Sequence, residues 1–271
     1  IYYDSSTPHG MIATGGTDCI FYAIVLNPAS EPISKLVHGG AREFITVKKQ
    51  NKKPEPKRVW NKFVIPTENE SGQLEKIDFA NTDSFNFGFD VIDAMATAHP
   101  DKLALLHISK DKTERRFTFT DIKKMSAKTA NYFKSLGIKK GDKVMLILKR
   151  HYQFWFAMVA LHKIGAIAIP ATNQLKEHDI TYRLNKAGVK MILCTADGDV
   201  SDEVEKASEF APCLEHKIIV NGEKKGWRNF DEEYTLYSSK FERTEDSPCG
   251  NDLMLMYFTS GTTGNPKVAM H

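Results

Sequence analysis

The chain after residue 85 alternates between short apolar runs and stretches in which apolar residues recur every three or four positions. The short runs predict buried strands, at 143–148, 166–169, 189–194 and 216–220. The recurring positions predict helices, at 122–136, 151–164, 177–187 and 200–209. Nearly continuous apolar strands joined by helices indicate a parallel sheet covered on both faces, so the predicted fold class is α/β.

The region ahead of this sheet carries its own local signals. One helical face there is apolar, and it comprises Phe89, Ile92, Met95 and Ala96. Strands at 103–108 and 116–119 are predicted to form a hairpin that turns at Asp111. Thr120 is the predicted N-cap of the next helix, and Gly137 fits the position just beyond its last residue.

The pattern divides the chain into three parts. Residues 1–47 show short apolar runs separated by turns, which is typical of all-β structure. Residues 48–58 are basic and contain two prolines, so they are predicted to be a linker. Residues 59–271 hold the α/β pattern and are predicted to be one domain.

Composition excludes several classes of protein. The formal net charge of +3 gives no general argument for a nucleic-acid partner, and no apolar stretch approaches the roughly 18 residues of a membrane span. The four cysteines form no CxxC pair, so we expect no metal site and free thiols in a reducing cytoplasm. The first residue is Ile and the last is His, and we expect both ends to be cuts through folded units of a longer protein.

A loop rich in glycine and hydroxyl side chains follows the predicted buried strand 252–258. Gly261 and Gly264 allow the backbone to turn and to approach a ligand closely, and successive N–H groups in such a loop can bind an anion. Further donors come from Thr259, Ser260, Thr262, Thr263 and Lys267. A flexible linker is the alternative, although a linker rarely follows a buried strand and ends in Pro-Lys. Val268 excludes a Walker A loop, which needs Ser or Thr after the lysine, and a helix is expected after the loop.

The sequence YFTSGTTGNPK (257–267) resembles the phosphate loop of the adenylate-forming enzymes, which include the AMP-forming acyl-CoA synthetases. Three further stretches resemble motifs of that family in the expected order, namely FNFGFDVID (85–93), FTFTDI (117–122) and LHKIGAIAIP (161–170). Residues 171–193 are most similar to the medium-chain branch, and the resemblance covers about 58–271. Several motifs in register carry more weight than one motif alone.

This resemblance implies an acid–thiol ligase. ATP would activate a short- or medium-chain carboxylic acid to an acyl-adenylate, with Mg²⁺ assisting, and CoA would then displace AMP. The residues implied to hold the β- and γ-phosphates are Thr259, Ser260, Gly261, Thr262, Thr263, Gly264 and Lys267. The family's catalytic residues and its Mg²⁺-binding glutamate lie beyond this loop, so we expect no catalytic or metal-binding residue in this chain and no acyl-adenylate from the chain alone.

Several polar residues have simpler explanations than chemistry. His151 is expected to be exposed near a helix start, and His162 is expected to face solvent or its edge. His178 and Asp179 fit the first turn of a helix, where Asp interacts favourably with the dipole. An acidic run could suggest a metal site but is typical of a solvated turn and helix start; it comprises Asp197, Asp199, Asp202, Glu203 and Glu205.

The first 47 residues resemble the last strands of a cupin, with His9 where cupins often keep their last metal-binding histidine. A single histidine makes no metal site, so a structural His9 is favoured. The resemblance implies a cupin fused to an acyl-CoA synthetase. Two other functions stay open, a non-catalytic nucleotide or acyl sensor linked to the cupin and an adenylation domain that loads a carrier protein. Downstream sequence would separate them, and the acyl-chain length and oligomeric state have no signal here.

Overall fold

The computed structural model describes residues 9–13, 22–26, 59–259 and 264–271. The chain divides into two compact units, 1–58 and 59–271, and each is described by itself. In the first unit, β1 (His9–Ala13) pairs antiparallel with β2 (Tyr22–Leu26). The predicted linker 48–58 and most of the predicted cupin segment lie outside the described residues, so both stay predictions.

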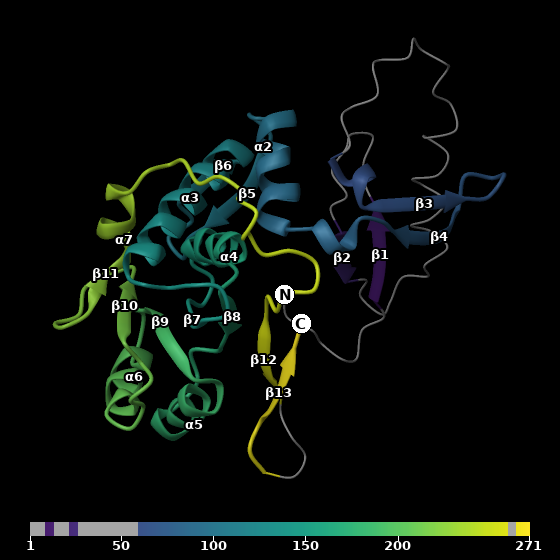
Figure 1. Cartoon of the computed structure of the whole chain (residues 1–271). Coiled ribbons are helices and arrows are strands. Elements are labelled where there is room, and N and C mark those ends of the chain that lie inside the picture. Colours follow the sequence, from purple (N-terminus) through teal and green to yellow (C-terminus); the bar gives the residue numbers. More distant parts are fainter. Residues whose placement is uncertain (1–8, 14–21, 27–58, 260–263) are drawn as a thin grey trace. The chain divides into compact units, whose positions relative to one another are not determined.

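The second unit is built on a five-stranded sheet with the order β11-β10-β9-β7-β8, in which every pair is parallel (Figure 1). Its strands are β7 (Lys143–Ile147), β8 (Ile167–Pro170), β9 (Val189–Thr195), β10 (His216–Val220) and β11 (Arg228–Asn229). The chain runs from β7 to β8 on one side and then crosses to β9 on the other. The connections therefore diverge between β7 and β9, which makes this the switch point of the sheet.

Alternate residues of each strand enter different hydrophobic clusters, because successive side chains of a strand point to opposite faces. In β7, Val144 and Leu146 belong to one cluster, whereas Met145 and Ile147 belong to the other. The first cluster contains residues of α3 (Phe119–Ser135), α4 (Gln153–Ile164) and α7 (Phe230–Glu233), and the second contains residues of α5 (Glu177–Ala187) and α6 (Val200–Ser208). The predicted α/β class, with helices on both faces, is confirmed.

The N-cap of α3 corrects one prediction. Thr118, not Thr120, precedes the helix, and its hydroxyl accepts a hydrogen bond from the Asp121 backbone N–H at 3.2 Å. The Asp121 carboxylate in turn accepts from the Thr118 backbone N–H at 2.8 Å. This reciprocal capping box satisfies two N–H groups at once. Gly137 has a φ of 79° just beyond the helix end, as predicted.

Shorter elements precede the sheet. A π-helix (Phe87–Asp93) continues into α2 (Ala94–Ala98), and all four residues of the predicted apolar face are buried there. The hairpins are β3 (Val64–Glu68) with β4 (Leu74–Phe79), and β5 (Leu103–Ile108) with β6 (Glu114–Thr118). The second hairpin was predicted, with strand ends one or two residues away.

The last segment differs from the prediction. The predicted strand 252–258 is shorter, since β12 spans Met256–Thr259. The expected helix after the loop is wrong, because β13 (Lys267–Met270) follows and pairs antiparallel with β12. β12 and β13 therefore form a hairpin, which Figure 1 shows at the end of the chain.

Candidate phosphate-binding site

The register of the β12–β13 hairpin determines which two residues flank the loop. Thr259 and Lys267 are directly paired across β12 and β13, so both stand where the loop begins and ends. The Thr259 hydroxyl donates to the Lys267 carbonyl at 3.4 Å, and both residues are exposed. The structure thus brings together two of the seven predicted residues, Thr259 and Lys267.

Gly264 is the third predicted residue that the structure describes. Its φ of 109° lies in a region that L side chains rarely adopt, and a Cβ built there would meet nothing within 4 Å. Glycine is therefore favoured by backbone conformation and not by crowding. Ser260, Gly261, Thr262 and Thr263 lie outside the described residues.

Two residues of α5 support the hairpin, and sequence analysis missed both. The Tyr182 hydroxyl donates to the Pro266 carbonyl at 3.1 Å, and the Arg183 guanidinium lies 5.4 Å from the ring centroid of Phe258. Just before β12, Leu255 forms a parallel β-bridge with Ala168 of β8. The loop is thus carried by a hairpin that is fixed to both a helix and the sheet edge.

A segment at 241–252 leads into this hairpin and is held by a buried amide. Asn86 is 6% exposed, and its Nδ2 donates to the His162 and Pro248 carbonyls at 2.9 Å each. Its Oδ1 accepts from the Phe89 backbone N–H at 3.2 Å. One side chain therefore joins the π-helix, α4 and the segment that precedes the phosphate loop.

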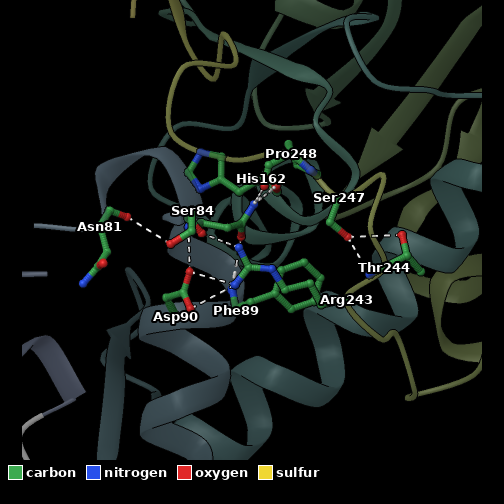
Figure 2. A network of polar contacts seen from close by, with 10 residues as sticks. Asn81, Ser84, Phe89, Asp90, His162, Arg243, Thr244, Ser247 and Pro248 are labelled. Atoms are coloured by element: carbon green, nitrogen blue, oxygen red, sulfur yellow. Dashed lines mark hydrogen bonds and ion pairs between the residues drawn. The ribbon is translucent and has the colours of Figure 1, made fainter. Parts of the chain in front are cut away.

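Arg243 adds a charged contact to the same network. Its Nη1 lies 3.0 Å from each carboxylate oxygen of Asp90, and its Nη2 donates to the Ser84 carbonyl. Figure 2 shows the guanidinium between Asp90 and the Phe89 ring, whose centroid is 5.7 Å from Cζ. The Asn86–Arg243 network thus ties residues more than 150 positions apart.

His162 corrects another prediction, because it is buried and does not face solvent. Its side chain is 7% exposed, and the ring packs edge-on against Phe87 with 5.7 Å between centroids. Neither ring nitrogen has a hydrogen-bond partner in the described structure. Burial lowers the pKa of His162 to about 4.

This buried histidine predicts acid sensitivity. Its pKa is lower in the folded chain than its ordinary 6.5, so the stabilising contribution is complete above pH 6.5 and is lost as pH falls toward 4. Between pH 7 and pH 5 the free energy of unfolding should fall by roughly 2 kcal/mol through this group. In urea unfolding, His162→Leu should lose about 2 kcal/mol less stability than the wild type between pH 7 and pH 5. The control His178→Leu changes a side chain that is 81% exposed, and it should lose as much stability as the wild type. Equal pH profiles for the wild type and His162→Leu would contradict the assignment.

The other polar residues that could suggest catalysis or metal binding have structural partners. His151 is not exposed as predicted, since its side chain is 14% exposed and its Nε2 lies 2.7 Å from the Thr195 hydroxyl. Within the acidic run, Asp199 and Asp202 pair with Lys176 and Lys224. Across the described ranges, no group of three or more His, Cys, Asp or Glu is arranged to hold a metal. No helix in the described part of the chain is long and apolar enough to cross a membrane.

This chain is similar in sequence to curated acyl-coenzyme A synthetases. Mitochondrial acyl-coenzyme A synthetase ACSM5 of Rattus norvegicus is 36% identical over 196 residues, which covers 69% of this chain and 33% of that protein. ACSM4 of Mus musculus is 34% identical over 195 residues, with the same coverage. The chain thus spans about one third of the length of the curated relatives it matches.

Solved structures agree on the fold. The anthranilate CoA ligase AuaEII, in complex with anthranoyl-AMP, has a TM-score of 0.63 at 23% identity and covers 70% of this chain and 35% of its own. The acyl-CoA synthetase of Brucella canis has a TM-score of 0.60 at 26% identity and covers 70% and 34%. The model of the AMP-binding enzyme family matches residues 92–271. This chain belongs to the family of AMP-binding enzymes.

Proposed function

We propose that this chain is part of an acid–thiol ligase that activates a short- or medium-chain fatty acid with ATP and transfers the acyl group to CoA. Family membership and the names of its relatives, acyl-coenzyme A synthetases, support this reaction. The observation that carries the proposal is the hairpin loop with Thr259 and Lys267 paired at its mouth. Since the aligned part of this chain covers only 33% of the ACSM5 relative, the complete reaction is proposed for a longer protein.

The loop residues would bind and orient the triphosphate. Lys267 places an exposed ammonium at the end of a loop rich in hydroxyls and glycine, and such donors pair well with phosphate oxygens. Held in this way, the β- and γ-phosphates would leave the α-phosphate facing the attacking carboxylate. Donors already in position when charge develops lower the barrier to adenylation.

Mg²⁺ does not fit the residues of this hairpin. No Asp or Glu follows Asp252 in the chain, and Mg²⁺ is usually held through carboxylates and substrate phosphates. We therefore derive no step through the metal. A cytoplasmic location is likewise a prediction, because the curated relatives carry the word mitochondrial in their names.

Lys267→Ala should slow acyl-adenylate formation by the complete ligase roughly ten- to a thousand-fold, the range for loss of one preorganised contact. Isotope exchange between pyrophosphate and ATP measures this step. Lys267→Arg keeps the charge and should retain more activity, and Lys186→Ala, at an exposed lysine of α5, should match the wild type. An unchanged exchange rate in Lys267→Ala would reject the assignment.

A further inference from the structure

The β3–β4 hairpin forms a two-stranded sheet of its own, and no other described strand pairs with it. Four large apolar side chains of this hairpin are exposed, namely Ile65, Leu74, Ile77 and Phe79, and Phe79 is 72% exposed. An isolated two-stranded hairpin is at best marginally stable in water, whereas sheets of three or more strands are more stable. The hairpin therefore has the properties of a sheet that a further strand completes.

The two edges of this hairpin differ in their hydrogen-bonding groups. Residue pairs along an antiparallel ladder alternate between pairs that exchange hydrogen bonds and pairs whose N–H and C=O groups point outward. The Ala80 N–H donates to the opposite Phe63 carbonyl at 3.0 Å, so the pair Pro66–Ile77, three steps along the register, directs its backbone groups outward. Pro66 has no N–H, which blunts the edge of β3. Ile77 presents both a donor and an acceptor at the edge of β4.

The charges of β4 match a second β4 strand that runs antiparallel to the first. When Ile77 lies opposite Ile77 of a second copy, Lys76 faces Asp78 and Asp78 faces Lys76. Moving the centre by one residue places Lys76 opposite Lys76, or Asp78 opposite Asp78, and like charges directly opposite each other are destabilising. The register centred on Ile77 also joins the outward backbone groups of Ile77 to those of its copy. Charge and hydrogen bonding thus select the same register.

The side chains on both faces of β4 fit this register. The Lys76 ammonium lies 2.7 Å from the Asp78 carboxylate of the same strand, so each of the four charges would have one opposite charge beside it and another across the interface. A network of this kind contributes more than a single exposed pair. On the opposite face, Ile77 would lie against its copy, with Phe79 at the diagonal position that an aromatic side chain can reach.

From these observations we propose that β4 is a self-association edge, at which two copies of this chain pair antiparallel about Ile77 and form the four-stranded sheet β3-β4-β4-β3. Such a two-fold contact is isologous and closes at a dimer. The register of the hairpin shifts beyond Thr67 and Lys76, so the regular edge is short. Interfaces below about 1,200 Å² are typical of transient association, so we expect dimers at about 100 µM and single chains at about 1 µM. Because the family model matches only residues 92–271, this association is independent of the ligase reaction proposed above.

Sedimentation velocity of the 271-residue chain tests the pairing. Lys76→Asp and Asp78→Lys each place like charges opposite each other twice in the dimer, so each variant should weaken association roughly ten-fold or more. The double variant Lys76→Asp/Asp78→Lys exchanges the charges and should dimerise as the wild type does. A mixture of the two single variants should form mixed dimers, because the aspartates of one strand then face the lysines of the other.

Arg116→Asp provides a matched control on another hairpin. Arg116 and Glu114 form an exposed ion pair two residues apart on β6, with 3.2 Å between them, so this variant changes the charge by the same amount as Lys76→Asp. It should dimerise as the wild type does. At the lower concentration, where the chains are single, urea denaturation should give similar midpoints for all variants, because exposed ion pairs contribute little within one chain.

Several results would overturn the pairing at β4. They are a wild type that stays monomeric at about 100 µM, a single variant that dimerises as strongly as the wild type, and a mixture of the single variants that stays monomeric. Loss of the dimer in Arg116→Asp would assign the effect to net charge and not to β4. A double variant that stays monomeric would exclude the register centred on Ile77. A monomeric wild type would assign the exposed edge to a different partner.

Discussion

Lys163→Met should lower the free energy of unfolding by about 3–5 kcal/mol, the cost of removing one partner of a buried ion pair. The Lys163 side chain is fully buried, and its ammonium lies 2.8 Å from the Asp93 carboxylate and 3.1 Å from the Ser126 hydroxyl. Burial lowers the pKa of Lys163 and raises that of Asp93, and in each case it outweighs their mutual attraction. Methionine fills the space but leaves Asp93 without its partner.

Urea denaturation of the 271-residue chain measures this loss, and two further variants make the result specific. Lys76→Met removes the charge from an exposed pair, with 2.7 Å between Lys76 and Asp78, and should cost less than about 1 kcal/mol. The double variant Lys163→Met/Asp93→Leu removes both buried charges and should recover most of the loss. If Lys163→Met costs no more than Lys76→Met, the buried pair does not stabilise the fold.

The parallel sheet could be predicted from sequence because its strands are buried on both faces and read as continuous apolar runs. The strands β7 to β10 accordingly lie within one or two residues of their predicted positions. The hairpin β12–β13 could not be predicted in the same way. It is short and mostly exposed or half-buried, so its apolar residues carry no clear period and do not exclude a helix.

The burial of His162 was not predicted for a related reason, and Lys163 was not singled out at all. Both residues lie at the end of an apolar helix, where basic residues usually interact with the helix dipole at the surface. Here the π-helix covers them, and the partner of Lys163 is 70 positions away in the chain. Local sequence does not contain such a contact.

The candidate site also combines features that local sequence predicts with contacts that it does not. Its loop chemistry is local, so Thr259, Gly264 and Lys267 could be proposed from residue type and from the resemblance to the phosphate loop, and their role stays a prediction. Its support is not local, since Tyr182 reaches Pro266 across 84 positions and Asn86 reaches Pro248 across 162. The sequence proposes which residues bind a phosphate, and the fold shows which distant residues contact the hairpin and the segment before it.

Asn86→Asp should lower the free energy of unfolding by about 3 kcal/mol or more. The shape of the side chain is retained, but a carboxylate cannot donate to the His162 and Pro248 carbonyls, which Asn86 Nδ2 contacts at 2.9 Å each. Two buried acceptors would lose their donor and face a negative oxygen, and each unsatisfied group costs about 1–3 kcal/mol. Asn86→Ala should cost less, because it brings no charge into the site.

Asn131 provides a matched control for this prediction. Its Nδ2 also donates to two carbonyls, of Ser238 and Lys240, at 2.8 and 2.9 Å. Asn131 is less buried than Asn86, so water can replace its lost contacts and Asn131→Asp should cost about 1 kcal/mol or less. The same urea series measures both, and equal losses in the two Asp variants would show that burial does not set the strength of the Asn86 contacts. Because the segment that Asn86 holds leads into the phosphate loop, Asn86→Ala should also weaken ATP binding, whereas Asn131→Ala should leave it unchanged.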